Sequence, residues 1–298
     1  MVDNKSQIEH SISQVRKRDG SVSDFNRDKI LNAIYKAFSA SNKPDKELAV
    51  KLSDGVLTKL TEHGFSANNP PSVESIQDLV ESTLIDQGHS DIAKSYILYR
   101  HERRKIREEK MKVLNTKTLD SVGKSFDINC LRVLASRYLF RDNKNEIIEK
   151  PTELFERVAV LVSISDLIRD NYLFTKDGGT SQNIEEAREY LKKLDDFSYK
   201  FKIGRYYLNK WHFRCLINCY VDLAKQGMMK VPFRELLTML ASKKFDAYAD
   251  RISEYYDLMT SQDFLPNSPT MMNLSLIHIS EPHETSLHLV CRLLLEKK

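Results

Sequence analysis

The sequence predicts a mainly α-helical protein with a small β-hairpin near its start. Three observations support this fold class. Apolar residues recur every three or four positions in successive stretches, which is the period of one face of an α-helix. Charged residues make up 30% and hydrophobic residues 41% of the chain, a balance typical of helix-rich globular proteins. The 298 residues correspond to about two domains at roughly 150 residues each.

The composition excludes several functional classes. With only 9 glycines, the sequence contains neither GxGxxG nor GxxxxGK[ST], so it lacks the dinucleotide-binding fingerprint and the P-loop. Its net charge of +4 is far from that of a polybasic arm, and we expect no direct binding to nucleic acid. The longest apolar run, residues 158–168, is too short to span a bilayer, and residues 1–10 are too polar for a signal peptide. Because the 4 cysteines form no disulfide framework, we expect a cytoplasmic protein with no membrane partner.

Residues 14–25 predict the hairpin. The sequence QVRKRDGSVSDF places Asp19 and Gly20 between two short segments that contain Val15 and Val22. An Asp-Gly pair is a strong signal for a two-residue turn in which both central residues have positive φ. We therefore expect a tight turn at these two residues.

Four amphipathic helices are predicted to follow the hairpin. They lie at residues 27–40, 46–63, 72–86 and 90–112. Their inward stripes are Ile30, Ile34 and Phe38; Leu48, Leu52, Val56 and Leu60; Val73, Ile76, Val80 and Leu84; and Ile92, Tyr96 and Tyr99. Ser72 is the expected N-cap of the third helix, because a serine hydroxyl can accept hydrogen bonds from the free N–H groups there. Each helix has a single apolar stripe, so the helices should pack on one another and on the hairpin.

Basic residues of this first domain gather in two places, one around the hairpin and the start of the first helix, the other at the end of the fourth helix. The first group is Arg16, Lys17, Arg18 and Lys29, and the second is Arg100, Arg103, Arg104, Lys105 and Arg107. The simplest interpretation is a solvated charged face, helped by the favourable position of cations at a helix C-terminus.

A more specific pattern runs through these residues. Residues 15–30 follow V-x-K-R-D-G-x-x-x-x-F-x-x-x-K-I, and SVESIQDLVE (72–81) and AKSYILYRHERRKIR (93–107) come after it. With these three motifs in this order, residues 13–112 resemble the ATP-cone family. The resemblance implies a regulatory domain that binds the adenine nucleotides ATP and dATP as allosteric effectors.

The resemblance assigns five residues to nucleotide binding: Lys17, Arg18, Asn26, Lys29 and Arg103. Lys17 and Arg18 would form charge-assisted hydrogen bonds to phosphate oxygens, which are roughly twice as strong as neutral ones. Lys29 would supply a further cation, and Asn26 an amide for the ribose or a phosphate. Arg103 would close the pocket.

Three further positions bear on this site. Arg104 is an alternative to Arg103 as the residue that closes the pocket. Ser23 and Gln77 stand where the family often has Glu or His near the sugar and base. The selectivity of this site is therefore expected to differ from that of the family pattern.

Residues 113–127 are polar and predict a linker to a second helical domain at residues 128–273. Its helices are predicted at residues 128–142, 152–170, 184–202, 205–226 and 233–261. The glycine-containing segment at residues 177–182 is expected to form an exposed loop.

Three features of this domain suggest functions, but packing explains each more simply. His212, Cys215 and Cys219 share one helix face, yet a structural zinc ion needs four ligands and no fourth has suitable spacing nearby. We therefore expect buried thiols beside a half-buried histidine and no metal site. The aromatic residues between 197 and 213 are expected in the core, and the tyrosine pair at 255–256 in ordinary packing.

The segment FLPNSPT at residues 264–270 differs in kind, because its two prolines favour an extended conformation. Together with RYLFRD (137–142) and TELFERVA (152–159), it makes residues 128–273 resemble the N-terminal region of a ribonucleotide reductase large (catalytic) subunit. The resemblance is greatest to the adenosylcobalamin-dependent class. It implies that Ser268 contacts the substrate phosphate.

This resemblance implies a parent ribonucleoside-diphosphate reductase, a homo-oligomer that makes deoxyribonucleotides for DNA synthesis with adenosylcobalamin as cofactor. The catalytic barrel of that family is absent from the sequence, so no catalytic residue is predicted and this fragment is expected to be inactive. Two alternatives are a stand-alone ATP-cone regulatory or interaction protein and a fragment of a di-iron-dependent (class I) reductase.

Residues 274–298 differ in composition from the rest of the chain. They contain three of the 8 histidines, and Pro282 interrupts any regular period. Their opening string, LSLIHISEP, resembles translated sequencing-adapter read-through. We therefore expect the native sequence to depart from this one after Asn273, with an unusual natural tail as the alternative.

Overall fold

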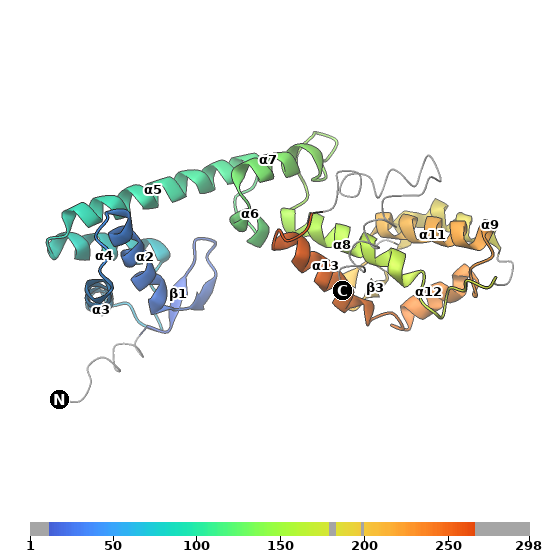
Figure 1. The fold of residues 1–298 in the computed structure, drawn as a ribbon, viewed down its shortest axis with the longest axis horizontal. Coiled ribbons are helices and arrows are strands. Elements are labelled where there is room, and N and C mark those ends of the chain that lie inside the picture. The colour runs from blue at the N-terminus through green and yellow to red at the C-terminus, as the bar shows by residue number, and fades with distance from the viewer. Residues whose placement is uncertain (1–11, 179–182, 198–199, 266–298) are drawn as a thin grey trace, which may run out of the picture. The chain divides into compact units, whose positions relative to one another are not determined.

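A computed structural model describes residues 12–178, 183–197 and 200–265 of the chain (Figure 1). Ser268 and the atypical segment 274–298 lie outside these described residues. The chain divides into two compact units, Met1–Met111 and Lys112–Lys298, which we describe separately. The fold is mainly helical, as the sequence predicts, but it contains two small hairpins where one was predicted.

The first unit begins with the predicted hairpin, but its loop is longer than expected. β1 (Gln14–Arg16) and β2 (Val22–Asp24) pair antiparallel. The Lys17 N–H donates to the Ser21 carbonyl at 2.7 Å, and the Gly20 N–H donates to the Lys17 carbonyl at 3.0 Å. Of the expected turn residues only Gly20 has positive φ (+85°), so the prediction of a two-residue turn is wrong. The observed loop instead has the pattern of a three-residue hairpin loop that ends in a left-handed glycine.

The four predicted helices of this unit are present. They are α2 (Arg27–Ala40), α3 (Lys46–Glu62), α4 (Val73–Asp86) and α5 (Ser90–Val113). The hydroxyl of Ser72 caps α4 by accepting from the Ser75 N–H at 3.0 Å, as predicted. The helices bury one shared core in which Ile34, Val56 and Leu84 are almost inaccessible to solvent.

Tyr99, the last residue of the predicted inward stripe of α5, does not face this core. Tyr99 is 47% exposed, whereas Ile92 and Tyr96 on the same helix are buried. The core cluster of this unit ends at Tyr96 along α5. The helical spacing of apolar residues predicted that Tyr99 is buried, but among the described residues no part of this core cluster packs against α5 beyond Tyr96.

The second unit starts with a segment that is more ordered than its polar composition suggests. The expected linker contains the short helix α6 (Ser121–Ser125), and Val122 and Phe126 are buried. Asp120 fixes this helix, because its carboxylate accepts hydrogen bonds from the Gly123 N–H at 2.6 Å and the Thr152 N–H at 2.9 Å. The segment is therefore packed against the domain that follows.

Several predicted helices of the second unit are shorter or divided. The observed elements are α7 (Ile128–Arg137), α8 (Pro151–Leu167), α9 (Ile184–Glu189), η1 (Tyr190–Lys193), α10 (Leu194–Phe197), β3 (Lys202–Ile203), β4 (Tyr206–Tyr207), α11 (Lys210–Lys225), α12 (Phe233–Ala241) and α13 (Tyr248–Thr260). The prediction of uninterrupted helices at 184–202, 205–226 and 233–261 is therefore wrong.

Local backbone geometry explains these breaks. Gly204 has φ +56° and connects β3 to β4, an antiparallel hairpin that the sequence analysis missed. Asn209 then caps α11, so that helix begins five residues later than predicted. Lys243 has φ +62°, a conformation that ends α12 and separates it from α13.

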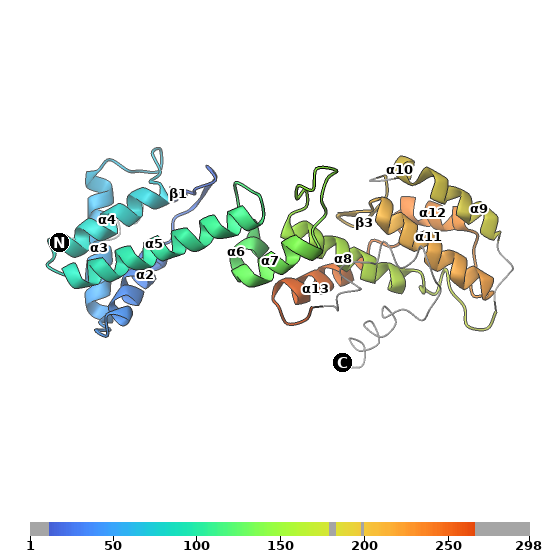
Figure 2. The same cartoon turned by 90° about the horizontal axis from the view of Figure 1, so that it is seen from above.

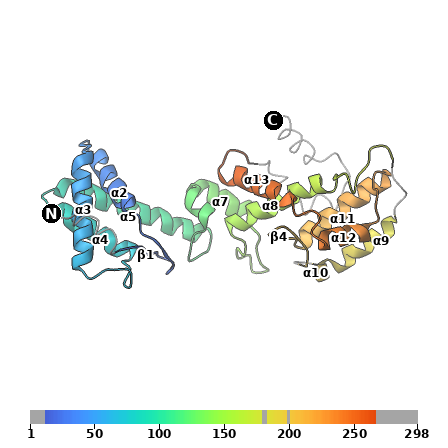
Figure 3. The same ribbon diagram turned by 90° about the horizontal axis from the view of Figure 1, so that it is seen from below.

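α8 is the central helix of the second unit. Figures 2 and 3 show it running beside α13 and α11, and it packs against both of them and against α6. From Val158 to Ile168 every residue except Asp166 is buried, which explains why this run has no polar face. Within the described residues, no helix is long and apolar enough to cross a membrane.

Candidate nucleotide-binding site

The hairpin of the first unit is fixed at the start of α4. The Arg16 N–H donates to the Pro71 carbonyl at 2.9 Å, and Arg16 forms a parallel bridge with Ser72, the N-cap of α4. The hairpin loop that follows carries Lys17 and Arg18, both exposed. Backbone pairing therefore holds two of the predicted phosphate-binding residues near the N-terminal turn of a helix, where anions are favoured.

Arg18 is engaged by two side chains of α4. Its Nε forms a hydrogen-bonded ion pair with the Glu74 carboxylate, and its Nη2 donates to Gln77 Oε1 at 3.3 Å. The side chains of Arg18 and Glu74 are 39% and 46% exposed, so the pair is open to solvent. Gln77, which the sequence analysis placed near the sugar and base, therefore contacts a phosphate-binding candidate directly.

The two candidates on α2 lie at its first turn. Asn26 is the N-cap, and its Oδ1 accepts from the Asp28 N–H at 2.8 Å. The two N–H groups of its side-chain amide can therefore donate hydrogen bonds to a ligand. Lys29 is exposed. Within the described residues, neither side chain makes a hydrogen bond or ion pair to Arg18.

The basic residues at the end of α5 are not equivalent. Arg103 is exposed and its guanidinium lies 5.8 Å from the centre of the Tyr99 ring. Arg104 lies 4.0 Å from Glu108 on the same helix. Arg103 lies one helical turn before Arg107, and its positive charge lowers the pKa of Arg107.

Arg107 is a basic residue of α5 that the sequence did not assign to the site, and the structure brings it near the hairpin. Burial lowers its pKa first, and the positive charges of Arg18 and Arg103 lower it further, while Glu74 opposes the shift. Arg107 therefore lies within electrostatic range of the Arg18–Glu74 pair. Its spacing of four residues from Arg103 was a signal that could have identified it.

A second set of charges joins α4 to α5. The Arg100 Nη1 donates to Asp78 Oδ1 and to Glu81 Oε1, each at 2.7 Å. Glu74, Asp78 and Glu81 recur along α4 at helical spacing. Carboxylates of α4 thus meet arginines at two places: Glu74 in the first turn meets Arg18 of the hairpin, and the middle of the helix meets Arg100 of α5.

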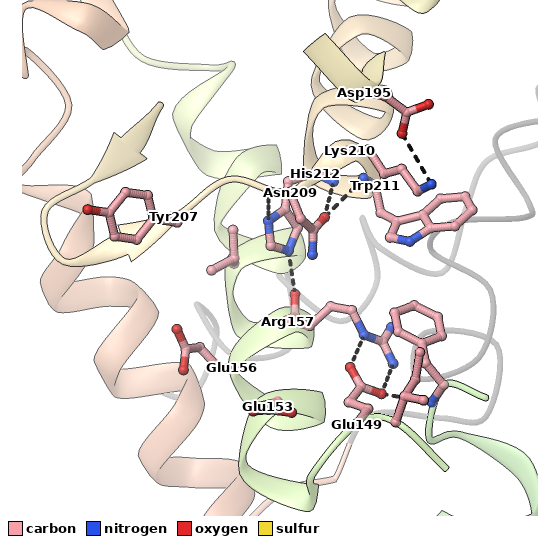
Figure 4. Close-up of a pocket in the computed structure, with 13 residues that line it drawn as sticks. Glu149, Glu153, Glu156, Arg157, Asp195, Tyr207, Asn209, Lys210, Trp211 and His212 are labelled. Atoms are coloured by element: carbon pink, nitrogen blue, oxygen red, sulfur yellow. Dashed lines mark hydrogen bonds and ion pairs between the residues drawn. The ribbon is translucent and has the colours of Figure 1, made fainter. Parts of the chain in front are cut away.

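A pocket of about 670 Å³ lies in the second unit (Figure 4). It is lined by Phe140, Ile148, Glu149, Glu153, Glu156, Arg157, Val160, Asp195, Tyr207, Asn209, Lys210, Trp211 and His212. A buried ion pair forms part of the lining, with the Arg157 Nε 2.8 Å from Glu149 Oε1. The Arg157 guanidinium also stacks 4.1 Å from the centre of the Phe140 ring. Figure 4 shows Lys210 directed toward Asp195, which it meets at 3.3 Å.

The structure corrects the burial predicted for the histidine–cysteine group of α11: the histidine is fully buried, Cys215 is buried as predicted, and Cys219 is only partly buried. His212 is 3% exposed, and its Nδ1 accepts from the Asn209 N–H at 3.1 Å. The sulfur atoms of Cys215 and Cys219 are 4.0 Å apart. In the described part of the chain, no group of three or more His, Cys, Asp or Glu residues is arranged to hold a metal ion.

Two family models match the chain. Residues 13–105 match the ATP cone domain. Residues 124–210 and 221–276 match the all-alpha domain of ribonucleotide reductase. The two matches follow one another in the order that the sequence motifs predicted.

Curated relatives agree with both matches. The chain is 33% identical over 267 residues to the vitamin B12-dependent ribonucleoside-diphosphate reductase of Thermoplasma acidophilum, covering 88% of the chain and 31% of the relative. It is 29% identical over 185 residues to the protein of the same name from Mycobacterium tuberculosis, covering 61% of the chain and 24% of the relative. It is 36% identical over 107 residues to the ribonucleoside-diphosphate reductase subunit alpha of Chlamydia trachomatis, covering 34% of the chain and 10% of the relative.

The chain therefore spans less than a third of the length of these relatives. It is homologous to the N-terminal region of reductase large subunits that carry this nucleotide-binding module. These matches do not favour a stand-alone regulatory protein, because a reductase domain follows the first unit.

Proposed function

We propose that this chain, whose first domain belongs to the ATP-cone family and whose second belongs to the all-alpha domain family of ribonucleotide reductase, binds ATP and dATP as allosteric effectors of a reductase. The observation that carries the proposal is the grouping of cations beside the hairpin loop. Lys17 is exposed there, and Arg18 and Arg107 lie within electrostatic range of each other. Such a group suits a triphosphate without a glycine-rich loop.

The proposed ligand contacts are divided between three elements. Lys17 and Arg18 from the hairpin, with Arg107 from α5, would bind phosphate oxygens. Asn26 and Lys29 at the first turn of α2 would bind the ribose or a further phosphate. Arg103, one turn before Arg107, would close the site over the nucleotide. The proposed regulatory domain comprises residues 13–112.

The activity of the whole protein is a further part of the proposal. Its relatives are named as ribonucleoside-diphosphate reductases, and two of them as vitamin B12-dependent. We assign to the whole protein the reduction of ribonucleoside diphosphates in the cytoplasm, as a homo-oligomer that uses adenosylcobalamin. The second domain, residues 128–273, would contribute Ser268 to the substrate phosphate.

His212, the histidine that lines the pocket, is not suited as a ligand to the cobalt of cobalamin. His212 is buried beside the pocket, but both of its ring nitrogens are occupied, one by the Asn209 N–H and the other by the Arg157 carbonyl. It therefore has no nitrogen available for cobalt. We place the radical chemistry in parts of the whole protein outside the described residues, and we expect the 298-residue chain alone to be inactive. The di-iron-dependent alternative is not favoured, because two of these relatives are named as vitamin B12-dependent.

Isothermal titration calorimetry of the full chain tests the effector site. Titration with ATP, and separately with dATP, should release or absorb heat with saturation near one nucleotide per chain. The double substitution Lys17→Ala and Arg18→Ala should abolish the heat, because it removes both hairpin cations from the phosphates.

A matched control removes the same charge elsewhere. Lys192 and Lys193 are adjacent exposed lysines in η1 of the second unit. Their double substitution to alanine should leave both titrations unchanged. If the unmodified chain gives no heat with either nucleotide, the assignment of an effector site is wrong.

A further inference from the structure

The carboxylate of Glu74 occupies the hydrogen-bonding edge of a guanidinium that the proposed function assigns to phosphate. Arg18 Nε binds the Glu74 carboxylate, and its Nη2 binds Gln77 Oε1 at 3.3 Å. Carboxylate and phosphate oxygens use the same fork of N–H donors on arginine. Arg18 therefore cannot direct this edge to a nucleotide while Glu74 holds it.

The fold keeps the two partners together. The hydrogen bond from the Arg16 N–H to the Pro71 carbonyl ties the strand before Arg18 to the residues before α4. Glu74 lies in the first turn of α4, where the helix dipole stabilises a negative charge. The carboxylate thus stands in the position that an anionic ligand of this helix end would favour.

The exposure of this ion pair and the charge near it would allow a phosphate group to replace the Glu74 carboxylate on Arg18. Both side chains are partly exposed, and ion pairs open to solvent are weak because water screens them. Arg107 adds a second positive charge within electrostatic range of Arg18 and Glu74. One carboxylate faces two cations here, so a triphosphate, with several negative charges, would neutralise the site more completely.

We propose that Glu74 is an intramolecular competitor of the nucleotide, whose carboxylate must leave the Nε edge of Arg18 before the phosphates can bind that edge. This inference rests on the proposed function, since it concerns the same site. The negative charge of Glu74 sets the affinity for adenine nucleotides below the value that the cations alone would give. Nucleotide binding then breaks the Arg18–Glu74 ion pair between the hairpin and α4. The side-chain contact between these two elements therefore differs between the free and the nucleotide-bound protein.

The test compares ATP binding by calorimetry for full-length variants. Glu74→Gln keeps the shape of the side chain but removes its charge, and it should bind ATP about two- to fivefold more tightly, which is the strength of an exposed ion pair expressed as an affinity ratio. Asp78→Asn is the matched control, because it removes a carboxylate one turn further along α4 that pairs with Arg100 instead. Its affinity for ATP should equal that of the unmodified chain.

A double-mutant cycle distinguishes competition from a general change in charge. In an Arg18→Ala background Glu74 has lost the guanidinium for which it competes, so Glu74→Gln should tighten binding clearly less than it does in the unmodified background. Equal or weaker binding by Glu74→Gln in the unmodified background would overturn the inference while leaving the effector site intact. Equal tightening by Asp78→Asn would also overturn it. Absence of heat in every variant, including the unmodified chain, would overturn both the effector site and this inference.

Discussion

His212 Nε2 lies 3.3 Å from the carbonyl oxygen of Arg157, so the first turn of α11 is tied to the middle of the central helix α8. The other ring nitrogen, Nδ1, accepts the Asn209 N–H, which completes a capping box with the side chain of Asn209. Since Nδ1 accepts, the neutral ring carries its proton on Nε2 and donates it to the carbonyl. The histidine therefore serves as a neutral connector between two helices.

This arrangement predicts that the second domain loses stability in acid. Burial lowers the pKa of His212 to about 3 from the ordinary value of 6.5. Below pH 6.5 the unfolded chain therefore binds a proton that the folded chain does not. The free energy of unfolding should fall as pH decreases from 6.5 toward 3, by at most about 1.4 kcal/mol per pH unit from this residue.

Urea denaturation at several pH values measures this effect. Trp211 is the single tryptophan of the chain, so its fluorescence reports on the second domain. His212→Gln cannot titrate, and glutamine suits the third position of a capping box. The variant should show a smaller loss of stability between pH 6.5 and 4 than the unmodified chain. Identical pH profiles would contradict the neutral, buried state of His212.

The buried Glu149–Arg157 pair predicts a large effect of a single substitution. Glu149 and Arg157 side chains are 8% and 5% exposed. Glu149→Gln would leave the guanidinium buried without its counter-charge, which should lower the free energy of unfolding by about 3–5 kcal/mol. Glu146→Gln is the control, because Glu146 is exposed in the same loop and should cost almost nothing. A small effect of both substitutions in urea denaturation would show that the pair contributes little.

Periodicity predicted most of the helices because their apolar stripes are local. The Ser72 cap and the limits of α2 follow from the residues within one or two turns. The β3–β4 hairpin could not be predicted in this way. Its turn depends on Gly204, whose N–H donates to Asp246 at 2.9 Å, and Asp246 is 42 positions further along the chain.

The candidate site shows the same limit. The motif around Lys17 and Arg18 identified the cations of the hairpin, because they are neighbours in sequence. The partner of Arg18 is Glu74, which is 56 positions away, and the spacing of charges along α4 does not indicate which arginine each carboxylate meets. Arg107 is distant from the hairpin in sequence for the same reason, and only the packing of α5 beside α4 makes it part of the site.

The position of Arg107 predicts a role in nucleotide affinity. Arg107→Ala should weaken ATP binding by about 10- to 100-fold, the range expected for the loss of one charge-assisted hydrogen bond. Lys105→Ala is its control, since Lys105 is exposed, lies two residues away on α5 and has no assigned role in the site. Calorimetry on both variants measures the difference. Equal weakening by the two substitutions would indicate that only the overall charge of α5 matters.

The turn at Gly204 predicts a loss of stability that exceeds the ordinary cost of replacing a left-handed glycine. A Cβ at Gly204 would lie 2.5 Å from the Cβ of Ala249 in α13, and its φ is +56°. Gly227 is a suitable control, because its φ is +70° but a Cβ there would have nothing within 4 Å.

Both substitutions to alanine carry the backbone strain of a left-handed residue, about 1–2 kcal/mol. Only Gly204→Ala must also push the β3–β4 turn away from Ala249 in α13, and overpacking of this kind adds about 1–3 kcal/mol. Urea denaturation followed by Trp211 fluorescence should therefore give a lower free energy of unfolding for Gly204→Ala than for Gly227→Ala. Equal stability of the two variants would show that a Cβ at position 204 meets no clash with Ala249 and that the β3–β4 turn does not pack tightly on α13.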